Sequence, residues 1–176
     1  MRASARSLCA LIVASLALAG CGFTPMYAAR DDGSSTAAEL GSVTVEPVTD
    51  RGRSYRLGQM MEHELTERFY RAGAQSVRFR LEMDLERERE GFGFRPDEAV
   101  TRVGLRLRAR YRLIDVSTDK VVFADTAQAY NSFDVVQSEF ATLAAEQDME
   151  SRLVDDLGQI IESRLARHLR EGEREP

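Results

Sequence analysis

The sequence predicts an α+β two-layer sandwich, in which a four-stranded and mostly antiparallel sheet carries two helices on one face in the order β-α-β-β-β-α. Two long segments, 77–88 and 102–113, alternate between apolar and charged residues, which is typical of half-buried strands. The segments before and after them repeat their apolar residues at helical spacing. In addition, 43% apolar and 30% charged residues in a chain of 176 are typical of a folded globular protein.

The first predicted elements are a short strand and a helix. Valines at positions 43, 45 and 48 surround Pro47, and a strand here belongs at a sheet edge because proline donates no hydrogen bond to a ladder. In the next segment an apolar residue recurs every four positions: Leu57, Met61, Leu65 and Phe69. This spacing predicts a helix that Ser54 caps and Gly73 ends.

The two alternating segments predict an antiparallel hairpin. Their odd-numbered residues are apolar and most of their even-numbered residues are charged, so each strand has one face for the core and one for solvent. The connector from Gly91 to Asp97 contains two glycines and a proline, which favours a turn. A second turn from Asp115 to Lys120 leads into a strand from Val121 to about Tyr130.

The last predicted element is a helix beyond Ser138. Its apolar residues fall on one face: Leu153, Val154, Leu157, Ile160, Ile161, Leu165 and Leu169. Phe140, Leu143 and Ala144 are placed to begin the same helix. With both helices on its apolar face, the sheet keeps a charged face on the other side.

The chain opens with the pattern of a processed signal. Two arginines precede an apolar run from Leu8 to Ala19, and this run of about twelve residues is shorter than the roughly 20 that span a bilayer. The run ends in Leu18-Ala19-Gly20-Cys21, which resembles a bacterial lipobox. We therefore expect cleavage before Cys21 and acylation of its thiol and its new amine. Gly22 is not an aspartate, which by resemblance to enteric sorting rules favours the outer membrane.

These patterns divide the chain into four parts. Residues 1–20 form the cleaved lipoprotein signal peptide, and residues 21–40 form a lipid anchor and a flexible tether rich in small and polar residues. Residues 41–171 form a single α+β domain, and residues 172–176 form a disordered tail. Acyl chains on Cys21 would hold the domain on a membrane.

Composition and motifs argue against several functions. A formal charge of −5 provides no positive field for nucleic acid, and two cysteines with two histidines speak against a zinc cluster. His63-Glu64 begins like a metalloprotease helix, but Glu67 stands where the second histidine is needed. Gly91-Phe92-Gly93 leads into a strand and not a helix, so it does not match a dinucleotide loop. We find no catalytic constellation and expect no enzyme.

Arginines gather at one end of the predicted hairpin. In one plausible register Arg80 faces Arg110 and Arg78 faces Arg112, and in another Arg80 faces Arg108. Like charges opposed on a sheet cost stability unless an anion lies between them, so Arg78, Arg80, Arg110 and Arg112 form a candidate anion site. Alternatively, acids such as Asp125 and Asp115 on the adjoining strand neutralise these arginines in a structural ladder. Both interpretations stay open.

Two stretches carry a family resemblance. Cys21-Gly22-Phe23-Thr24-Pro25-Met26-Tyr27 resembles the opening of the LPS-assembly lipoprotein family, LptE, whose members commonly begin Cys-Gly-Phe-x-Pro-Leu-Tyr. Tyr130-Asn131-Ser132 through Phe140 to Asp148 resembles the family's alphaproteobacterial branch. The resemblance implies a lipoprotein on the periplasmic side of the outer membrane that plugs the LptD β-barrel, assists its assembly and helps deliver lipopolysaccharide to the outer leaflet. It implies no enzymatic activity and no cofactor.

Two sets of residues are candidates for contacting the ligand and the partner that the resemblance implies. Because like charges gather at Arg78, Arg80, Arg110 and Arg112, these arginines would bind lipopolysaccharide through its phosphates. Because Phe92, Phe94 and Arg95 stand on a loop with two glycines at the hairpin tip, they would contact LptD. A different class of protein fits the same features. An auxiliary lipoprotein of an ABC-type lipid transport system is also anchored and also a small α+β domain, but it binds a periplasmic partner and not a barrel.

Overall fold

The computed structural model describes residues 36–50, 55–71, 73, 76–94, 100–136 and 138–172. Several expectations lie outside these residues: the signal peptide, the lipidation of Cys21, the cap at Ser54, Arg95 at the hairpin tip and residues 173–176 of the tail. The backbone of Phe94 is described, whereas its side chain is not.

The observed elements confirm the α+β class. In chain order they are α2 (Thr36–Leu40), β1 (Val43–Val45), β2 (Thr49–Asp50), α3 (Tyr55–Arg71), β3 (Phe79–Phe94), β4 (Val100–Asp115), β5 (Lys120–Asp134) and α4 (Glu139–Gly172). Helix α4 is a single helix of 34 residues that includes Phe140, Leu143 and Ala144, as the sequence indicated. Gly73 follows α3 in a left-handed conformation with φ of 106°, and its amide donates to the carbonyl of Tyr70.

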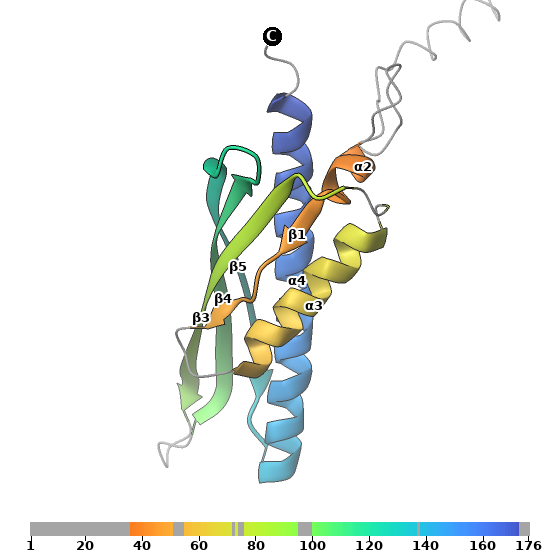
Figure 1. Ribbon diagram of the computed structural model, residues 1–176. Coiled ribbons are helices and arrows are strands. Elements are labelled where there is room, and N and C mark those ends of the chain that lie inside the picture. The colour runs from red at the N-terminus through yellow and green to blue at the C-terminus, as the bar shows by residue number, and fades with distance from the viewer. Residues whose placement is uncertain are drawn as a thin grey trace, which may run out of the picture.

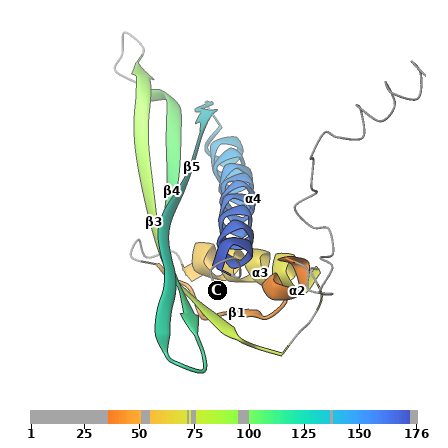
Figure 2. The same cartoon turned by 90° about the horizontal axis from the view of Figure 1, so that it is seen from above.

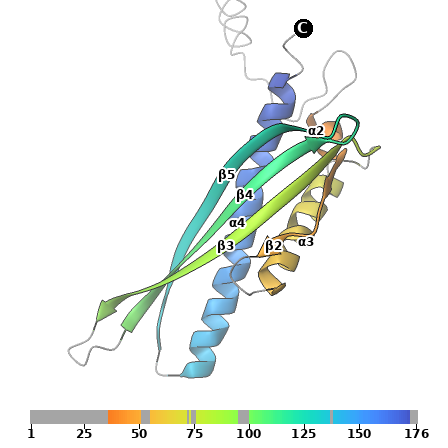
Figure 3. The same ribbon diagram turned by 60° about the vertical axis from the view of Figure 1, so that its left-hand side comes forward.

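The sheet is mixed and runs in the order β1-β3-β4-β5 (Figure 3). Strand β4 pairs antiparallel with β3 on one side and with β5 on the other, as predicted. Strands β1 and β2 follow each other along the outer edge of β3 and run parallel to it. Parallel neighbours need a crossover, and α3 provides it between β2 and β3.

Both long helices cover the same face of the sheet (Figures 1 and 2). The odd-numbered side chains of the strands point toward them and are buried: Leu81, Met83, Leu85, Val103, Leu105, Leu107, Ala109, Tyr111 and Leu113. Helix α3 contributes Leu57, Met61, Leu65 and Phe69 to this core, as the four-residue spacing predicted. Helix α4 contributes Leu153, Leu157, Ile161 and Leu165.

The hairpin of β3 and β4 is longer than predicted, and both predicted registers are wrong. Glu82 lies opposite Arg112, Asp84 opposite Arg110 and Glu88 opposite Arg106. The pairing continues through Gly91 and Phe92 to Phe94 opposite Val100, so the turn begins only after Phe94. Gly93 adopts a φ of 72°, and its carbonyl accepts a hydrogen bond from the Thr101 hydroxyl at 2.9 Å. Glycines expected to form the turn therefore lie within the strand.

A short helix replaces the end of the predicted tether. Residues 36–40 form α2, which packs against α4 and buries Leu40 completely. The hydroxyl of Ser42 donates to the carbonyl of Glu39 at 2.6 Å and closes the helix end. The last five of residues 21–40, which were expected to belong to the anchor and flexible tether, thus form a helix, because Leu40 belongs to the core.

Candidate functional site

The most extended feature of the surface is the polar face of the sheet, formed by the even-numbered side chains of β3, β4 and β5 on the side away from the helices (Figure 3). Glutamates of β3 and arginines of β4 pair across it. Arg112 lies 2.6 Å from Glu82, Arg110 lies 3.2 Å from Glu86, and Arg106 lies 3.1 Å from Glu88. The row on β5 beside them carries few charges: Ala124, Thr126, Gln128, Tyr130 and Ser132.

This register removes the like-charge oppositions from which the anion site was argued. Arg110 and Arg112 lie opposite acids, and Arg80 lies opposite Ile114. Arg80 donates to Asp119 at 3.0 Å, and this hydrogen bond is the main reason that the pKa of Arg80 is raised. These cross-strand ion pairs agree with the second interpretation, in which neighbouring acids neutralise the arginines in a structural ladder. The acids that pair with Arg110 and Arg112 come from β3, however, and not from β5.

Three of the four predicted arginines line two separate hollows, and Arg80 lines neither of them. Arg110 and Arg112 line a shallow groove of about 670 Å³ on the polar face, together with Glu46, Glu82 and Asp84. Arg78 lines a second pocket of about 410 Å³ near α2. The Arg78 guanidinium lies 5.2 Å from the centre of the Phe79 ring, and it makes no ion pair with another described residue. The structure therefore does not bring the four arginines together.

Aromatic side chains mark the other end of the polar face. Phe92 and Tyr130 approach Gly104 so closely that a Cβ atom there would lie 3.2 Å from the Phe92 ring and 2.7 Å from the Tyr130 hydroxyl. The Arg106 guanidinium lies 5.6 Å from the centre of the Tyr130 ring. Phe92 was singled out from the sequence, whereas Tyr130 as its neighbour was not, because only the sheet brings them together.

A second charged cluster lies on the core side of the sheet, and sequence reasoning missed it. Glu150 of α4 is only 5% exposed and pairs with both Arg56 of α3 and Arg87 of β3. Arg87 also pairs with Glu146 at 3.1 Å, and Arg89 lies 3.7 Å from the same carboxylate. A signal was present in the sequence, since Arg87 and Arg89 occupy odd positions that should be apolar.

Asp125 takes part in a network on the helix side. Its carboxylate accepts from Arg164 of α4 at 2.7 Å and from the Tyr111 hydroxyl at 3.4 Å, so it does not neutralise the predicted arginines. Burial opposes ionisation of Asp125, but the Thr126 amide and the Arg164 guanidinium outweigh this effect and lower the pKa of Asp125. Burial, together with the Asp125 charge, raises the pKa of Tyr111 to about 12.

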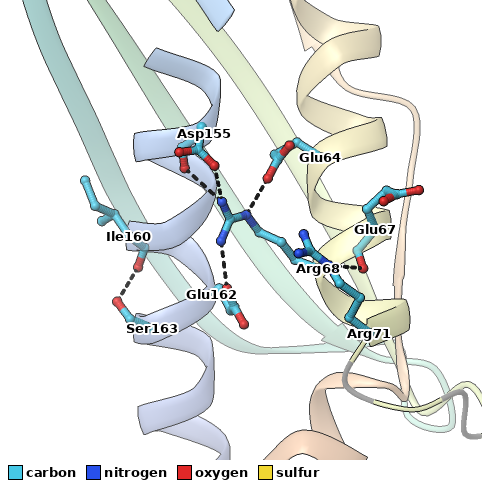
Figure 4. Close-up of polar contacts among 8 residues, drawn as sticks. All are labelled: Glu64, Glu67, Arg68, Arg71, Asp155, Ile160, Glu162 and Ser163. Carbon is cyan, nitrogen blue, oxygen red and sulfur yellow. Dashed lines mark hydrogen bonds and ion pairs between the residues drawn. The ribbon is translucent and has the colours of Figure 1, made fainter. Parts of the chain in front are cut away.

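Arg68 joins the two long helices (Figure 4). It leaves α3 and donates to Glu64 at 2.6 Å, to Glu162 of α4 at 3.1 Å and to Asp155 of α4. Gly158 of α4 allows this approach, because a Cβ atom there would lie 3.1 Å from the Arg68 Nε. Arg71, one turn further on, donates to the carbonyl of Glu67 at 3.3 Å and to no acid among the described residues.

The described part of the chain contains no group of three or more histidines, cysteines or acids placed to hold a metal ion. His63 lies on the exposed side of α3 beside Gln59, Glu62 and Thr66. Within the same residues, no helix is both long enough and apolar enough to cross a membrane.

The fold and the polar face define a small α+β domain with a long, charge-paired sheet face. Solved bacterial proteins share this fold. One is a Caulobacter crescentus CB15 protein described as a lipoprotein, with a TM-score of 0.58 and 17% identity over 74% of this chain and 92% of that one. Another is a Xanthomonas campestris protein of the DUF330 family, with a TM-score of 0.51 and 10% identity over 76% and 87% of the chains. No curated protein matches the sequence.

The chain belongs to the LptE family. The model of this family, described as lipopolysaccharide-assembly, matches residues 40–165, which is well over half of the chain. This confirms the resemblance seen in the sequence. Membership of this non-enzymatic lipoprotein family assigns the protein to lipopolysaccharide assembly in the cell envelope and to association with the lipopolysaccharide transport machinery.

Proposed function

We propose that the protein is lipidated at Cys21, lies on the periplasmic side of the outer membrane, plugs the LptD β-barrel, and helps to assemble it and to deliver lipopolysaccharide. The observation that carries this proposal is the polar face of the sheet, where glutamates of β3 between Glu82 and Glu88 pair with arginines of β4 between Arg106 and Arg112. Barrels of this kind have polar interiors. A sheet that is polar on one face and sealed by α3 and α4 on the other matches such an interior.

The ion pairs on this face are exposed and weak, so their side chains remain available to bind a partner protein. Each exposed pair contributes only about 0–1 kcal/mol, so its side chains can exchange partners at little cost. The rows of β3 and β4 supply both signs of charge, and the row of β5 supplies hydroxyl and amide groups. Donors and acceptors in a barrel wall would thus find partners over the whole face, which avoids buried polar groups without hydrogen bonds.

Co-purification tests the proposed partner. LptD should be recovered with the protein from detergent-solubilised outer membrane, and cells without the protein should contain less correctly assembled barrel. Replacing Phe92, Phe94 and Arg95 with alanine should weaken this recovery while the domain stays folded. Alanine at Val116, Thr118 and Lys120, in the turn at the opposite end of the sheet, provides the matched control.

Two results would contradict this assignment. Equal recovery of LptD with both triple variants would show that the hairpin tip is not the contact. Recovery of an ABC-type lipid transporter in place of any β-barrel would favour the auxiliary-subunit alternative.

Lipidation at Cys21 has its own test. Intact-mass analysis of the membrane form should show a chain that begins at Cys21 and carries added lipid, since Leu18-Ala19-Gly20 precede that residue. Cys21→Ala should remain uncleaved or without lipid. Normal lipid attachment to the variant would refute the site.

Direct binding of lipopolysaccharide by the arginines also remains a proposal. Arg78 has no acidic partner among the described residues, and Arg110, whose side chain is 48% exposed, can exchange Glu86 for a phosphate. Arg78→Ala with Arg110→Ala should lower the affinity of the full chain for lipopolysaccharide, and the difference should shrink at high salt. Arg71→Ala with Arg152→Ala removes the same charge from the helices and should leave affinity unchanged. Equal losses in both variants would show a general charge effect and no site.

A further inference from the structure

A pocket near the start of the described chain has one residue, Arg78, with a role in the functions proposed above, and its other residues have none. It has a volume of about 410 Å³ and lies between α2, the start of β3, the turn after β4 and the end of α4. Its lining is mixed: Glu39, Arg78, Phe79, Asp115, Val122, His168 and Leu169. Several valines around it are exposed, with Val77 at 56%, Val116 at 47% and Val122 at 40%. Apolar surface therefore extends beyond the pocket itself.

The chemistry of the pocket suits an apolar peptide with an aromatic side chain. Phe79, Val122 and Leu169 provide apolar walls, and the His168 ring stacks on Phe123 with 4.4 Å between ring centres. Two of the charged groups in the pocket already interact with neighbouring residues. Asp115 accepts hydrogen bonds from Ser117 and Thr118, and Arg78 lies over the Phe79 ring. A ligand in this pocket would bury apolar surface against rings and aliphatic groups. It would also make one or two polar contacts.

The chain itself contains a segment with this chemistry. Residues 23–27 read Phe-Thr-Pro-Met-Tyr, in a region of otherwise small and polar residues that ends where α2 begins. A flexible spacer between a lipid anchor and a domain needs no cluster of apolar side chains. Apolar side chains contribute favourable free energy only when they are removed from water.

The segment is within reach of the pocket. Eight residues lie between Tyr27 and Thr36, and an extended chain of that length spans up to about 30 Å from one residue to the other. Glu39, three residues into α2, already lines the pocket. We propose that Phe23–Tyr27 of the same chain docks in this pocket, with its aromatic and proline side chains against Phe79, Val122 and Leu169.

Docking would set the orientation of the domain on a membrane. Only Gly22 separates Cys21 from the docked segment, so the end that contains α2 and the end of α4 would lie next to the lipid. The hairpin tip lies at the other end of the molecule (Figures 1 and 3), and α4 alone is about 51 Å long at 34 residues. The tip would then point away from the lipid surface to which the chain is attached. This consequence rests on the proposed lipidation, whereas the docking itself does not.

Cysteine cross-linking tests the proposal in the full chain. Tyr27→Cys combined with Val122→Cys should form an intramolecular disulfide under mild oxidation, because docking brings the two residues within the short Cα separation that a disulfide requires. Tyr27→Cys with Tyr70→Cys is the matched control. Tyr70 is 73% exposed and lies at the end of α3 near Gly73, which contacts Gly41 after α2, so an undocked segment could reach it as well.

The expected result is a yield at least severalfold higher for the Val122 pair than for the Tyr70 pair. Val122→Cys alone should keep a maleimide-reactive thiol, which shows that Cys21 does not supply the partner. Equal yields for the two pairs would overturn the proposal, since a freely moving segment would reach both sites. A disulfide-linked dimer would also overturn it, because the segment would then occupy the pocket of a second copy. These readouts do not involve LptD or lipopolysaccharide and are separate from the proposed function.

Discussion

Arginine residues lie in three different environments in this domain, and each predicts a different result when the residue is removed. Arg112 is 60% exposed and pairs with Glu82 on the polar face, so its loss should cost at most about 1 kcal/mol. Arg68 has a side chain only 15% exposed and contacts three carboxylates between α3 and α4. Arg87 shares the buried carboxylate of Glu150 with Arg56. Residue type alone does not distinguish these roles, whereas burial does.

Tyr111 gives a pH-dependent prediction at the same scale. Its folded-state pKa is raised to about 12 from an unfolded value near 10, so the neutral hydroxyl is favoured in the fold. This contribution to stability is fully present below about pH 10 and is lost as the pH rises toward 12. Between these pH values the free energy of unfolding should therefore fall less in Tyr111→Phe than in the wild type. Denaturant unfolding at a series of pH values measures the difference.

Tyr55→Phe is the control for that measurement, because Tyr55 is 89% exposed. It should keep the wild-type pH profile. An alkaline loss of equal size in Tyr111→Phe and wild type would contradict the assignment of this effect to Tyr111.

At the scale of the elements, Arg68 is the cation that three carboxylates share at the contact between α3 and α4. Arg68 compensates Glu64, Asp155 and Glu162, which would otherwise repel one another at the contact of the two helices (Figure 4). Desolvation opposes the charge of Arg68, but the hydrogen bonds to Glu162 and Glu64 outweigh it and raise the pKa of Arg68. The partial burial of Arg68 makes its interactions stronger than those of the exposed ladder.

Arg68→Met should lower the free energy of unfolding by about 1–3 kcal/mol, because it leaves the Glu64, Asp155 and Glu162 carboxylates close together without their cation. Urea unfolding measures the change. Arg71→Met on the same helix should change stability by less than about 0.5 kcal/mol, since Arg71 is exposed. Adding Glu162→Gln to Arg68→Met should recover part of the loss. No recovery would indicate that packing of the Arg68 side chain, and not charge, joins the helices.

For the whole molecule, the two edges of the sheet are protected by different devices. On β5, the Thr126 amide donates to Asp125 at 2.7 Å, the Thr126 carbonyl accepts from Arg164 at 3.0 Å, and the Ser132 amide donates to Asn131 at 2.9 Å. On β3, no described strand follows β2 beside residues 86–94. Glu and Arg alternate over residues 86–90, so pairing with the same segment of a second copy would oppose like charges in every register that keeps the polar faces of the two sheets on the same side. Both devices disfavour edge-to-edge association.

Removing the side-chain caps of β5 should therefore promote self-association. Asp125→Ala with Asn131→Ala frees the amides of Thr126 and Ser132, and size-exclusion chromatography with light scattering should show larger species as concentration rises. Asp125→Asn keeps an acceptor oxygen beside Thr126 and should remain like wild type. A monomeric double variant at all concentrations would show that the caps do not protect this edge.

The sequence by itself determined the class of fold, the side of each strand that meets the core and the family opening at Cys21–Tyr27. These are local properties: alternation assigns Leu81 to the core and Glu82 to solvent whatever lies opposite them, and spacing does the same for Leu57 and Leu65 in α3. The tertiary structure decided the register and therefore the site. A shift by two residues keeps every side chain on its face, so alternation could not tell an arginine opposite Arg80 from the observed Ile114. The register and the site become known only from contacts between residues that are far apart in the chain. These contacts are the full pairing of β3 with β4, the approach of Tyr130 to Phe92 and the ion pair of Glu150 with Arg87.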